Sequence, residues 1–323
     1  MATRQQTKKQ KTFIGNLLEF IGLLLLVYVV RTVGFGLYQV PSGSMETTML
    51  VGERYFADKL SYWIRAPRRG EIIAFNDPTY TYSQDNQFMF LFERYVWGPS
   101  NWTKRVVGIP GDIVRGTVED GKPVVYLNGE KLDEPYLNKY PLIHIFRQDP
   151  AFLTERVQQE LQGYFYGDVD RAMLMRYLSE DRYTGWVSYD PDTSYADQPF
   201  YRLEENRVIK DNDGNLELQW PGTSRPSKNI FDAASGRKRF WEGSDEFYVE
   251  LGPGEYWCMG DNRLNSADCR VFGPIQEKHI HGRIIFRIWS MDSDEGWWIV
   301  DLFKHPIDFW VRIRWSRFFQ CMF

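Results

Sequence analysis

The stretch Lys104-Arg-Val-Val-Gly-Ile-Pro-Gly-Asp-Ile-Val-Arg115 decides the fold, because two short apolar runs flank a Pro-Gly turn. Short apolar runs bounded by turn residues are typical of β-strands. Similar runs occur at 71–75 and 124–127, and the second is followed by Asn128-Gly129, a strong hairpin signal. Strands at this spacing predict a mainly β fold, with an antiparallel sheet or barrel-like core.

β character returns near the C-terminal end, in Gly252–Met259 and in Gly282–Trp289. Strand alternation puts Ile284, Phe286 and Ile288 on one face. The segment between the two β regions is polar and contains one helical stretch, 154–161, so we interpret it as an inserted mixed subdomain. The predicted units are a tail and transmembrane anchor (1–35), a β domain (36–135 plus 251–295), the insert (136–250) and a basic aromatic tail (296–323).

The N-terminus predicts a retained membrane anchor. Four basic residues, Arg4, Lys8, Lys9 and Lys11, precede an apolar run, 13–30, that is near the length needed to cross a bilayer. No small-x-small cleavage site follows, which argues against a cleaved signal peptide; a buried helix is the other alternative. The positive-inside rule places the basic tail in the cytoplasm and the rest of the chain outside.

Composition sets further limits. The net charge of −4 argues against a nucleic-acid partner. Three cysteines form no disulfide framework, although Cys258 and Cys269 are equally compatible with a pair and with two unpaired core residues. His279-x-His281 is compatible with a metal pair, but no third ligand is evident, so we expect ordinary surface histidines and no metal or other cofactor.

Two aromatic segments allow alternative interpretations. Residues 88–92, followed by Tyr95, Trp97 and Trp102, fit either a core strand or a loop that dips into the membrane. The tail from residue 297 fits a strand or a helix equally well, and its basic aromatic character suits either a membrane interface or packing on the domain.

The candidate chemistry is nucleophilic attack by serine with lysine as base. The four histidines stand in unremarkable contexts. A lysine can act as base if its pKa falls from about 10.4 to roughly 7–8, which corresponds to about 3–4 kcal/mol of destabilisation of the charged form. Lys104 precedes an apolar run that supplies such a setting, provided that Arg105 points the other way.

Four segments carry a family resemblance. They are Val40-Pro-Ser-Gly-Ser-Met45, Arg69-Gly-Glu-Ile-Ile-Ala-Phe75, Lys104-Arg-Val-Val-Gly-Ile-Pro-Gly-Asp112 and Gly260-Asp-Asn-Arg-Leu-Asn-Ser-Ala-Asp-Cys-Arg270. In this order, behind an N-terminal span, they resemble the sequence boxes of bacterial type I signal peptidases, which are Ser/Lys peptidases. The ending Ile313-Arg-Trp-Ser-Arg-Phe318 is also similar to endings in that family.

The resemblance implies roles for individual residues. Ser44 is expected to be the nucleophile and Lys104 the general base. The Ser42 hydroxyl and the Ser44 backbone N–H are expected to form the oxyanion hole, and Ser266 to orient the lysine by a hydrogen bond. The remaining expected roles are structural: Asp268 and Arg270 pair to hold the last box near the dyad, and Met45 shapes the floor below Ser44.

The resemblance also implies substrates and surroundings. We expect cleavage of exported preproteins after small residues at −1 and −3, with the catalytic domain outside the plasma (inner) membrane and a single span. Membrane lipid is an expected partner, and the secretion translocase is a further candidate. A peptidase of narrow range and a silent precursor-binding relative are the alternatives, and a self-cleaving repressor does not fit the span. Thr47, Glu71, Leu264 and Cys269 depart from the family pattern without removing a reacting group.

Overall fold

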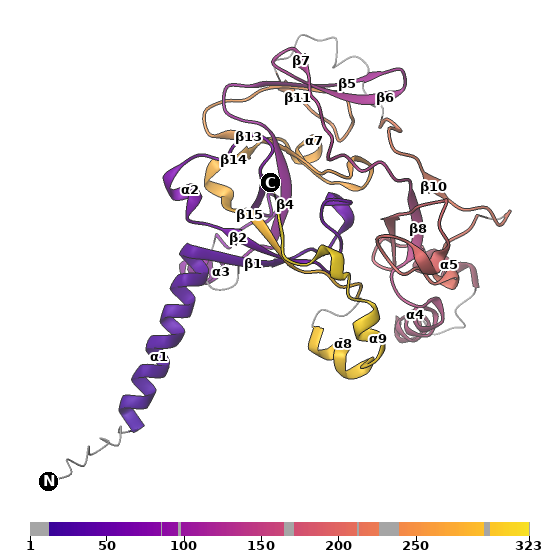
Figure 1. The fold of residues 1–323 in the computed structure, drawn as a ribbon, viewed down its shortest axis with the longest axis horizontal. Coiled ribbons are helices and arrows are strands. Elements are labelled where there is room, and N and C mark those ends of the chain that lie inside the picture. The colour runs from indigo at the N-terminus through magenta and orange to yellow at the C-terminus, as the bar shows by residue number, and fades with distance from the viewer. Residues whose placement is uncertain are drawn as a thin grey trace, which may run out of the picture.

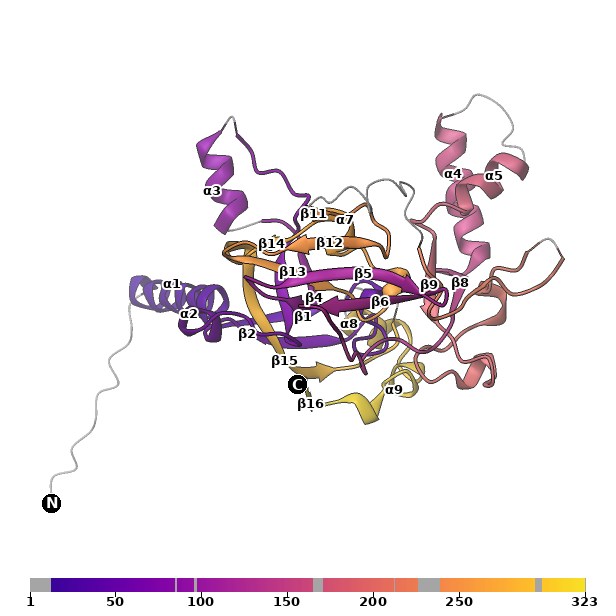
Figure 2. The same ribbon diagram turned by 90° about the horizontal axis from the view of Figure 1, so that it is seen from above.

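In the part of the chain that the structure describes, the strands form three antiparallel sheets, so the mainly β class is confirmed (Figures 1 and 2). The computed structural model describes residues 13–84, 86–95, 98–164, 171–211, 213–225, 239–293 and 298–322. The eight-stranded sheet comprises, in spatial order, β1 (Phe35–Gln39), β2 (Arg54–Asp58), β15 (Ile280–Trp289), β3 (Ile72–Asn76), β4 (Asn101–Gly108), β13 (Glu255–Met259) and β14 (Ile275–Gln276), with β16 (Gln320–Cys321) beside β15.

A five-stranded sheet packs against the large one. Its strands are β11 (Arg239–Phe240), β12 (Phe247–Glu250), β5 (Ile113–Glu119), β6 (Lys122–Leu127) and β7 (Glu130–Lys131). Asn128 and Gly129 form the turn between β6 and β7 with φ of 53° and 89°, the left-handed pair that a type I′ hairpin requires. Composition groups residues 239–250 with the insert. The structure places them in this sheet instead, where β12 pairs with β5.

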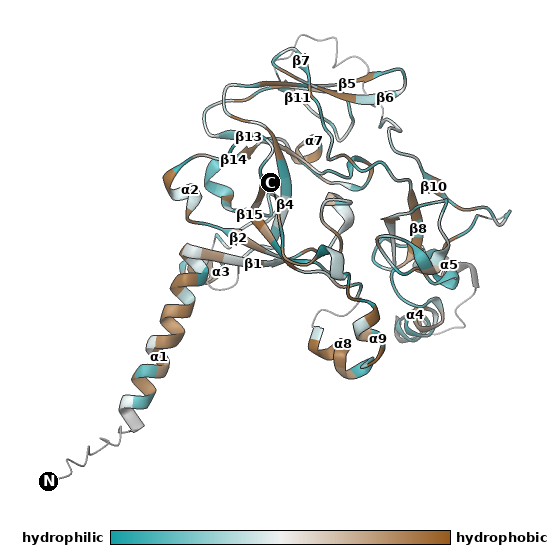
Figure 3. Cartoon of the chain, viewed as in Figure 1, coloured by the Kyte–Doolittle hydropathy of each residue, from teal (hydrophilic) through white to brown (hydrophobic). Residues whose placement is uncertain are grey.

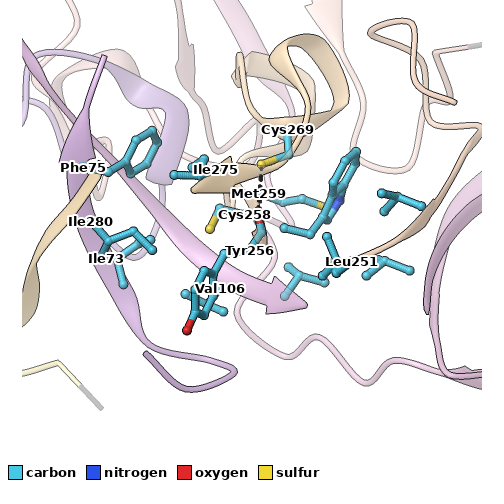
Figure 4. Close-up of a cluster of buried hydrophobic side chains, with 14 of the residues drawn as sticks. Ile73, Phe75, Val106, Leu251, Tyr256, Cys258, Met259, Cys269, Ile275 and Ile280 are labelled. Atoms are coloured by element: carbon cyan, nitrogen blue, oxygen red, sulfur yellow. Dashed lines mark hydrogen bonds between the residues drawn. The ribbon is translucent and has the colours of Figure 1, made fainter. Parts of the chain in front are cut away.

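The main core lies between these two sheets (Figure 4). Trp257 of β13 is fully buried and stacks on Phe247 of β12 at 4.9 Å between ring centroids. Val106 of β4 and Val114 of β5 are buried in the same cluster. Burying one such side chain stabilises the fold by about 1.5–3 kcal/mol, so this interface fixes β4, and with it residue 104, in the interior.

The insert forms a separate layer with its own small core. Its sheet contains β10 (Leu218–Gln219), β8 (Leu142–Phe146) and β9 (Thr184–Ser188). The predicted helix 154–161 is confirmed within α4 (Pro150–Tyr164), which packs on α5 (Arg171–Leu178) through Leu153, Val157 and Leu178.

The N-terminal helix leaves the domain with its apolar side chains exposed. The helix α1 (Phe13–Val29) continues as a π-helical turn, η1 (Val30–Gly34). Within the described residues, one helix is long and apolar enough to cross a membrane: Gly15–Gly34, with a mean hydropathy of 2.0 and 6% of its window buried. That exposure rules out the buried-helix interpretation. The basic residues Arg4, Lys8, Lys9 and Lys11 lie outside the described residues.

The two ambiguous aromatic segments are both helical. The core-strand interpretation of 88–92 is wrong, because α3 (Gln87–Tyr95) is a helix that exposes Phe88 at 72% and Leu91 at 45%. Trp97 lies outside the described residues. The tail forms α8 (Trp298–Lys304) and α9 (Asp308–Val311) and then β16, and packs on the domain through Phe309 and Ile313. The described residues also include the short helices α2 (Ser61–Ile64) and α7 (Cys269–Phe272).

Candidate active site

Ser44 lies in a tight turn that the last sequence box holds in place. The turn is η2 (Gly43–Met45), a single 3-10 turn that follows β1, and Ser44 is 9% exposed. Asn262 binds the turn twice: its backbone N–H donates to the Ser44 carbonyl at 3.1 Å, and its side-chain amide donates to the Gly43 carbonyl at 2.9 Å. These bonds fix the backbone that carries the Ser44 hydroxyl.

Lys104, on strand β4, points at the Ser44 hydroxyl. Its Nζ lies 2.8 Å from Ser44 Oγ, and the side chain is 4% exposed. Pairing of β4 with β3 places Lys104 opposite Ile73, inside the sheet. Arg105, the next residue, binds Asp261 instead, with Nε 2.8 Å from Oδ1. The two residues brought together here are therefore the two predicted reacting groups.

Burial lowers the pKa of Lys104 to about 8, well below its ordinary value of 10.5. The physical cause is desolvation: removing water destabilises the ammonium more than the neutral amine. The negative charge of Asp268 acts in the opposite direction and limits the shift. A substantial fraction of Lys104 is thus neutral at mildly alkaline pH.

A cleft of about 260 Å³ opens onto these two side chains. Ser42 lines it, and its hydroxyl donates to Ser44 Oγ at 3.4 Å. The apolar wall residues are Val40, Pro41, Met45, Met49, Trp102 and Ala267. Asn101, Thr103 and Asn265 add polar groups to the lining. Met45 is 2% exposed and belongs to a buried cluster with Val40 and Met49.

Ser266 lies beside the turn but does not make the expected hydrogen bond to Lys104. Its hydroxyl is buried and has no hydrogen-bond partner among the described residues. A Cβ built on Gly260 would lie 2.3 Å from Ser266 Oγ and 2.4 Å from the Ser44 carbonyl oxygen. Both residues therefore pack against Gly260, where only glycine fits. Lys104 directs its Nζ to Ser44.

Asp268 and Arg270 form a fully buried ion pair. Arg270 Nε and Nη2 each lie 2.9 Å from an Asp268 oxygen, and Arg270 Nη1 lies 2.6 Å from Asp245 Oδ1. Asp268 also accepts from the Gly260 N–H at 3.1 Å and caps α7. Burial alone would raise the pKa of Asp268. The positive charge of Arg270 outweighs this effect and holds that pKa well below its ordinary value.

Glu46, which sequence reasoning missed, anchors the other side of the nucleophile turn. It is fully buried, and it accepts hydrogen bonds from the Ser188 N–H at 2.9 Å, from the Ser188 hydroxyl at 2.7 Å and from the Tyr201 hydroxyl. Burial outweighs these donors and raises the pKa of Glu46 to about 7. Ser188 and Tyr201 belong to the insert, so the insert contacts the turn directly.

The C-terminal tail contacts the segment that follows the same turn. Arg317 Nε lies 2.6 Å from Glu53 Oε1, and its Nη2 lies 3.2 Å from the Thr48 carbonyl oxygen. Thr48 in turn donates from its hydroxyl to Asp261 at 2.6 Å. The Gly260-Asp-Asn sequence could have indicated Asp261 and Asn262, because it belongs to the last box. Arg317 lies in the ending 313–318 that resembles the family, but nothing in that pattern predicts its contact with Glu53.

The cysteines near the site are two unpaired, buried residues (Figure 4). The Cys258 N–H donates to Cys269 Sγ at 3.1 Å. His281 is half-buried and its Nδ1 lies 3.1 Å from the Tyr38 hydroxyl. No group of three or more His, Cys, Asp or Glu side chains that could hold a metal ion occurs in the described part of the chain.

Two of the four unusual residues contact the network through their main chains. The Leu264 carbonyl accepts from Arg225, and the Thr47 carbonyl lies 3.4 Å from Arg317 Nη2. The side chain of Glu71 pairs with Arg65, with Nη2 2.6 Å from Oε1. None of these contacts involves Ser44 or Lys104.

Comparisons with known proteins agree on one family. The family model "Signal peptidase, peptidase S26" matches residues 14–173 and 192–289. A signal peptidase I of Buchnera aphidicola is 25% identical over 307 residues, 91% of this chain and 81% of the relative. A probable signal peptidase I-2 of Synechocystis is 33% identical over 182 residues, 53% of this chain and 76% of the relative. A signal peptidase I of Pseudomonas aeruginosa is 34% identical over 169 residues, 50% of this chain and 56% of the relative.

Proposed function

Since this chain belongs to the signal peptidase family, peptidase S26, we propose that Ser44 and Lys104 are its reacting groups. The chain is a serine peptidase that removes signal peptides from preproteins. The observation that carries the assignment of the dyad is the 2.8 Å contact between Lys104 Nζ and Ser44 Oγ in an enclosed cleft.

The proposed reaction runs through an acyl-enzyme. Neutral Lys104 removes the Ser44 hydroxyl proton as the oxygen attacks the carbonyl carbon of the −1 residue. The Ser42 hydroxyl and the Ser44 N–H stabilise the resulting oxyanion. The Lys104 ammonium then gives its proton to the leaving amine, and the peptide bond breaks. Neutral Lys104 next deprotonates a water that attacks the ester, and the proton returns to Ser44.

Ser266 and the Asp268–Arg270 pair are proposed to position these groups. A buried hydroxyl without a partner costs about 1–3 kcal/mol. The orphaned Ser266 hydroxyl therefore supports a role in which it bonds the lysine when substrate tightens the site. The buried ion pair supports a role in holding 260–268 against the turn.

Selectivity for small residues at −1 and −3 is proposed to follow from the shape of the cleft. Met45, Met49 and Trp102 surround the reacting groups, and the whole cleft encloses about 260 Å³. We propose that these bulky walls leave room for alanine next to Ser44 and exclude large side chains. Apolar walls also keep water from the lysine.

The membrane is the proposed working surface. Anchoring by α1 in the plasma (inner) membrane, as a single pass with a cytoplasmic N-terminus, is supported by the apolar exposed helix. In Figure 3, the ribbons of α1 and α8 are both coloured largely as hydrophobic, and both lie in the lower part of the view. Trp298 and Phe303 of α8 and the following Ile307 are 40%, 81% and 83% exposed, and we propose that they contact lipid. The secretion translocase is a further proposed partner.

A cleavage assay tests the function. Purified full-length enzyme in detergent is mixed with a preprotein that carries Ala-x-Ala before the expected site, and the new N-terminus is sequenced. We expect one cut after the final alanine. Replacing that −1 alanine by tryptophan is the matched control and should block the cut. Cleavage that ignores the −1 residue would contradict the proposed substrate class.

The pH dependence of kcat/KM tests the role of Lys104. The base must be neutral, and its pKa lies at about 8, so activity should rise as pH increases through that value. Below the transition, kcat/KM should fall about tenfold per pH unit, because the neutral fraction does so. The measurement is the initial rate between pH 6 and 10 at low substrate concentration. A flat profile across this range would contradict the lysine base.

A further inference from the structure

A second cleft, of about 440 Å³, adjoins the dyad cleft. Val40 and Pro41 line both clefts, so the two cavities meet across the backbone that leads into the Ser44 turn. One wall of the second cleft is this backbone together with Val51 and Gly52, and the opposite wall belongs to the insert. An extended chain in the first cleft can therefore continue into the second.

The insert wall of this second cleft is basic. Arg147, Arg156 and Arg182 line it, together with one carboxylate, Glu160. Glu160 is already bound by Arg156 at 3.2 Å and by the Tyr183 hydroxyl at 3.0 Å.

Arg147 supplies the uncompensated charge. Its Nε donates to the main-chain carbonyl of Asp181 at 3.3 Å, and no carboxylate pairs with it in the described part of the chain. Arg182, by contrast, has Glu180 at 2.9 Å. A positive charge therefore remains on the wall of a groove that leads from the dyad. A partner chain with negative side chains would complement it.

The position of the anchor gives the direction of the substrate. In both views α1 lies at one side of the molecule and the insert helices α4 and α5 lie at the opposite side (Figures 1 and 2). The apolar part of a signal peptide remains in the membrane that holds α1 while the chain is cut. The part of the substrate that extends away from the anchor, beyond the scissile bond, is the mature chain.

We propose that the second cleft binds the first residues of the mature chain and favours acidic side chains there. This inference rests on the proposed function, because it needs a preprotein held in the dyad cleft. The ligand is thus an extended, negatively charged peptide segment beginning just after the cleavage site. Arg147 is its specificity residue, and the insert contributes to substrate choice.

The experiment compares preproteins that differ in charge at +2 to +5. One carries aspartates, one serines and one lysines, behind the same signal peptide. For the wild-type enzyme we expect kcat/KM to be about two- to fivefold higher for the aspartate substrate than for the serine one, as for a partly exposed ion pair. The gain should appear in KM and should shrink at high salt. R147E should reverse the preference toward lysine, read as the ratio of kcat/KM between the lysine and aspartate substrates of the same variant.

Matched controls separate this idea from its alternatives. R176E introduces the same charge change on α5, outside the cleft lining, and should keep the aspartate preference. Moving the aspartates to −7 to −4 should make R147E and wild type equal; a response to those upstream charges would overturn the assigned direction. Equal rates for all three substrates, or an unchanged preference in R147E, would overturn the proposal. Cleavage of the serine substrate would still support the proposed function.

Discussion

Replacing Lys104 by methionine is expected to lower kcat for preprotein cleavage by at least about a thousandfold, since it removes the general base. Methionine retains the length and apolar stem of the side chain but cannot accept the Ser44 proton. Because Lys104 is 4% exposed, the charge-free replacement suits the site, and we expect folding to be retained or improved. Single-turnover cleavage measured at pH 9 checks the loss, and thermal unfolding of the same sample checks the fold.

The dyad also predicts that the activity losses caused by replacing Ser44 and Lys104 are not additive. S44A should lose activity by a factor similar to that of K104M, and the double variant should be no worse than either alone, because the two groups act as one unit. R115E, a charge change on β5 outside the cleft lining, is the control and should keep wild-type rates. Losses that multiply in the double variant would contradict a shared step, and near wild-type turnover in K104M would contradict the assignment of the base.

Replacing Asp268 by alanine is expected to lower the free energy of unfolding by about 3–5 kcal/mol, the cost of leaving a buried charge without its partner. Arg270 would keep Asp245 but lose both contacts to residue 268. The N-cap of α7 and the acceptor for the Gly260 N–H would go as well. Thermal or urea unfolding in detergent gives the change. E119A, which breaks the exposed Lys131–Glu119 pair, should cost less than about 1 kcal/mol.

D268N separates the electrostatic role from the structural one. Asparagine still caps a helix, so the variant should be more stable than D268A. The substitution removes the negative charge that raises the pKa of Lys104, so that pKa should fall. The rise of kcat/KM with pH should therefore move to a lower pH. A profile that stays at the wild-type pH in a folded D268N would show that Asp268 does not act on the lysine.

The sequence allowed some parts of the site to be predicted because they depend on short, contiguous patterns. The Ser44 turn, the Lys104 strand and the Asp268–Arg270 pair each lie within one box. Glu46 could not be found in this way, because its partner Tyr201 is 155 residues away and only the topology brings them together. The helix α3 was not predicted, and a core strand and a loop were left as alternatives, because five consecutive apolar residues have no period that distinguishes helix from strand.

The contact of Glu46 with Ser188 and Tyr201 limits how this enzyme can be shortened. A truncated version that lacks the insert would leave the Glu46 carboxylate without three hydrogen bonds, and this carboxylate directly follows the Ser44 turn. Any attempt to build a minimal enzyme, or to graft the insert onto another scaffold, must therefore redesign position 46 at the same time. The insert and the turn are one unit for protein engineering, although the chain separates them by more than a hundred residues.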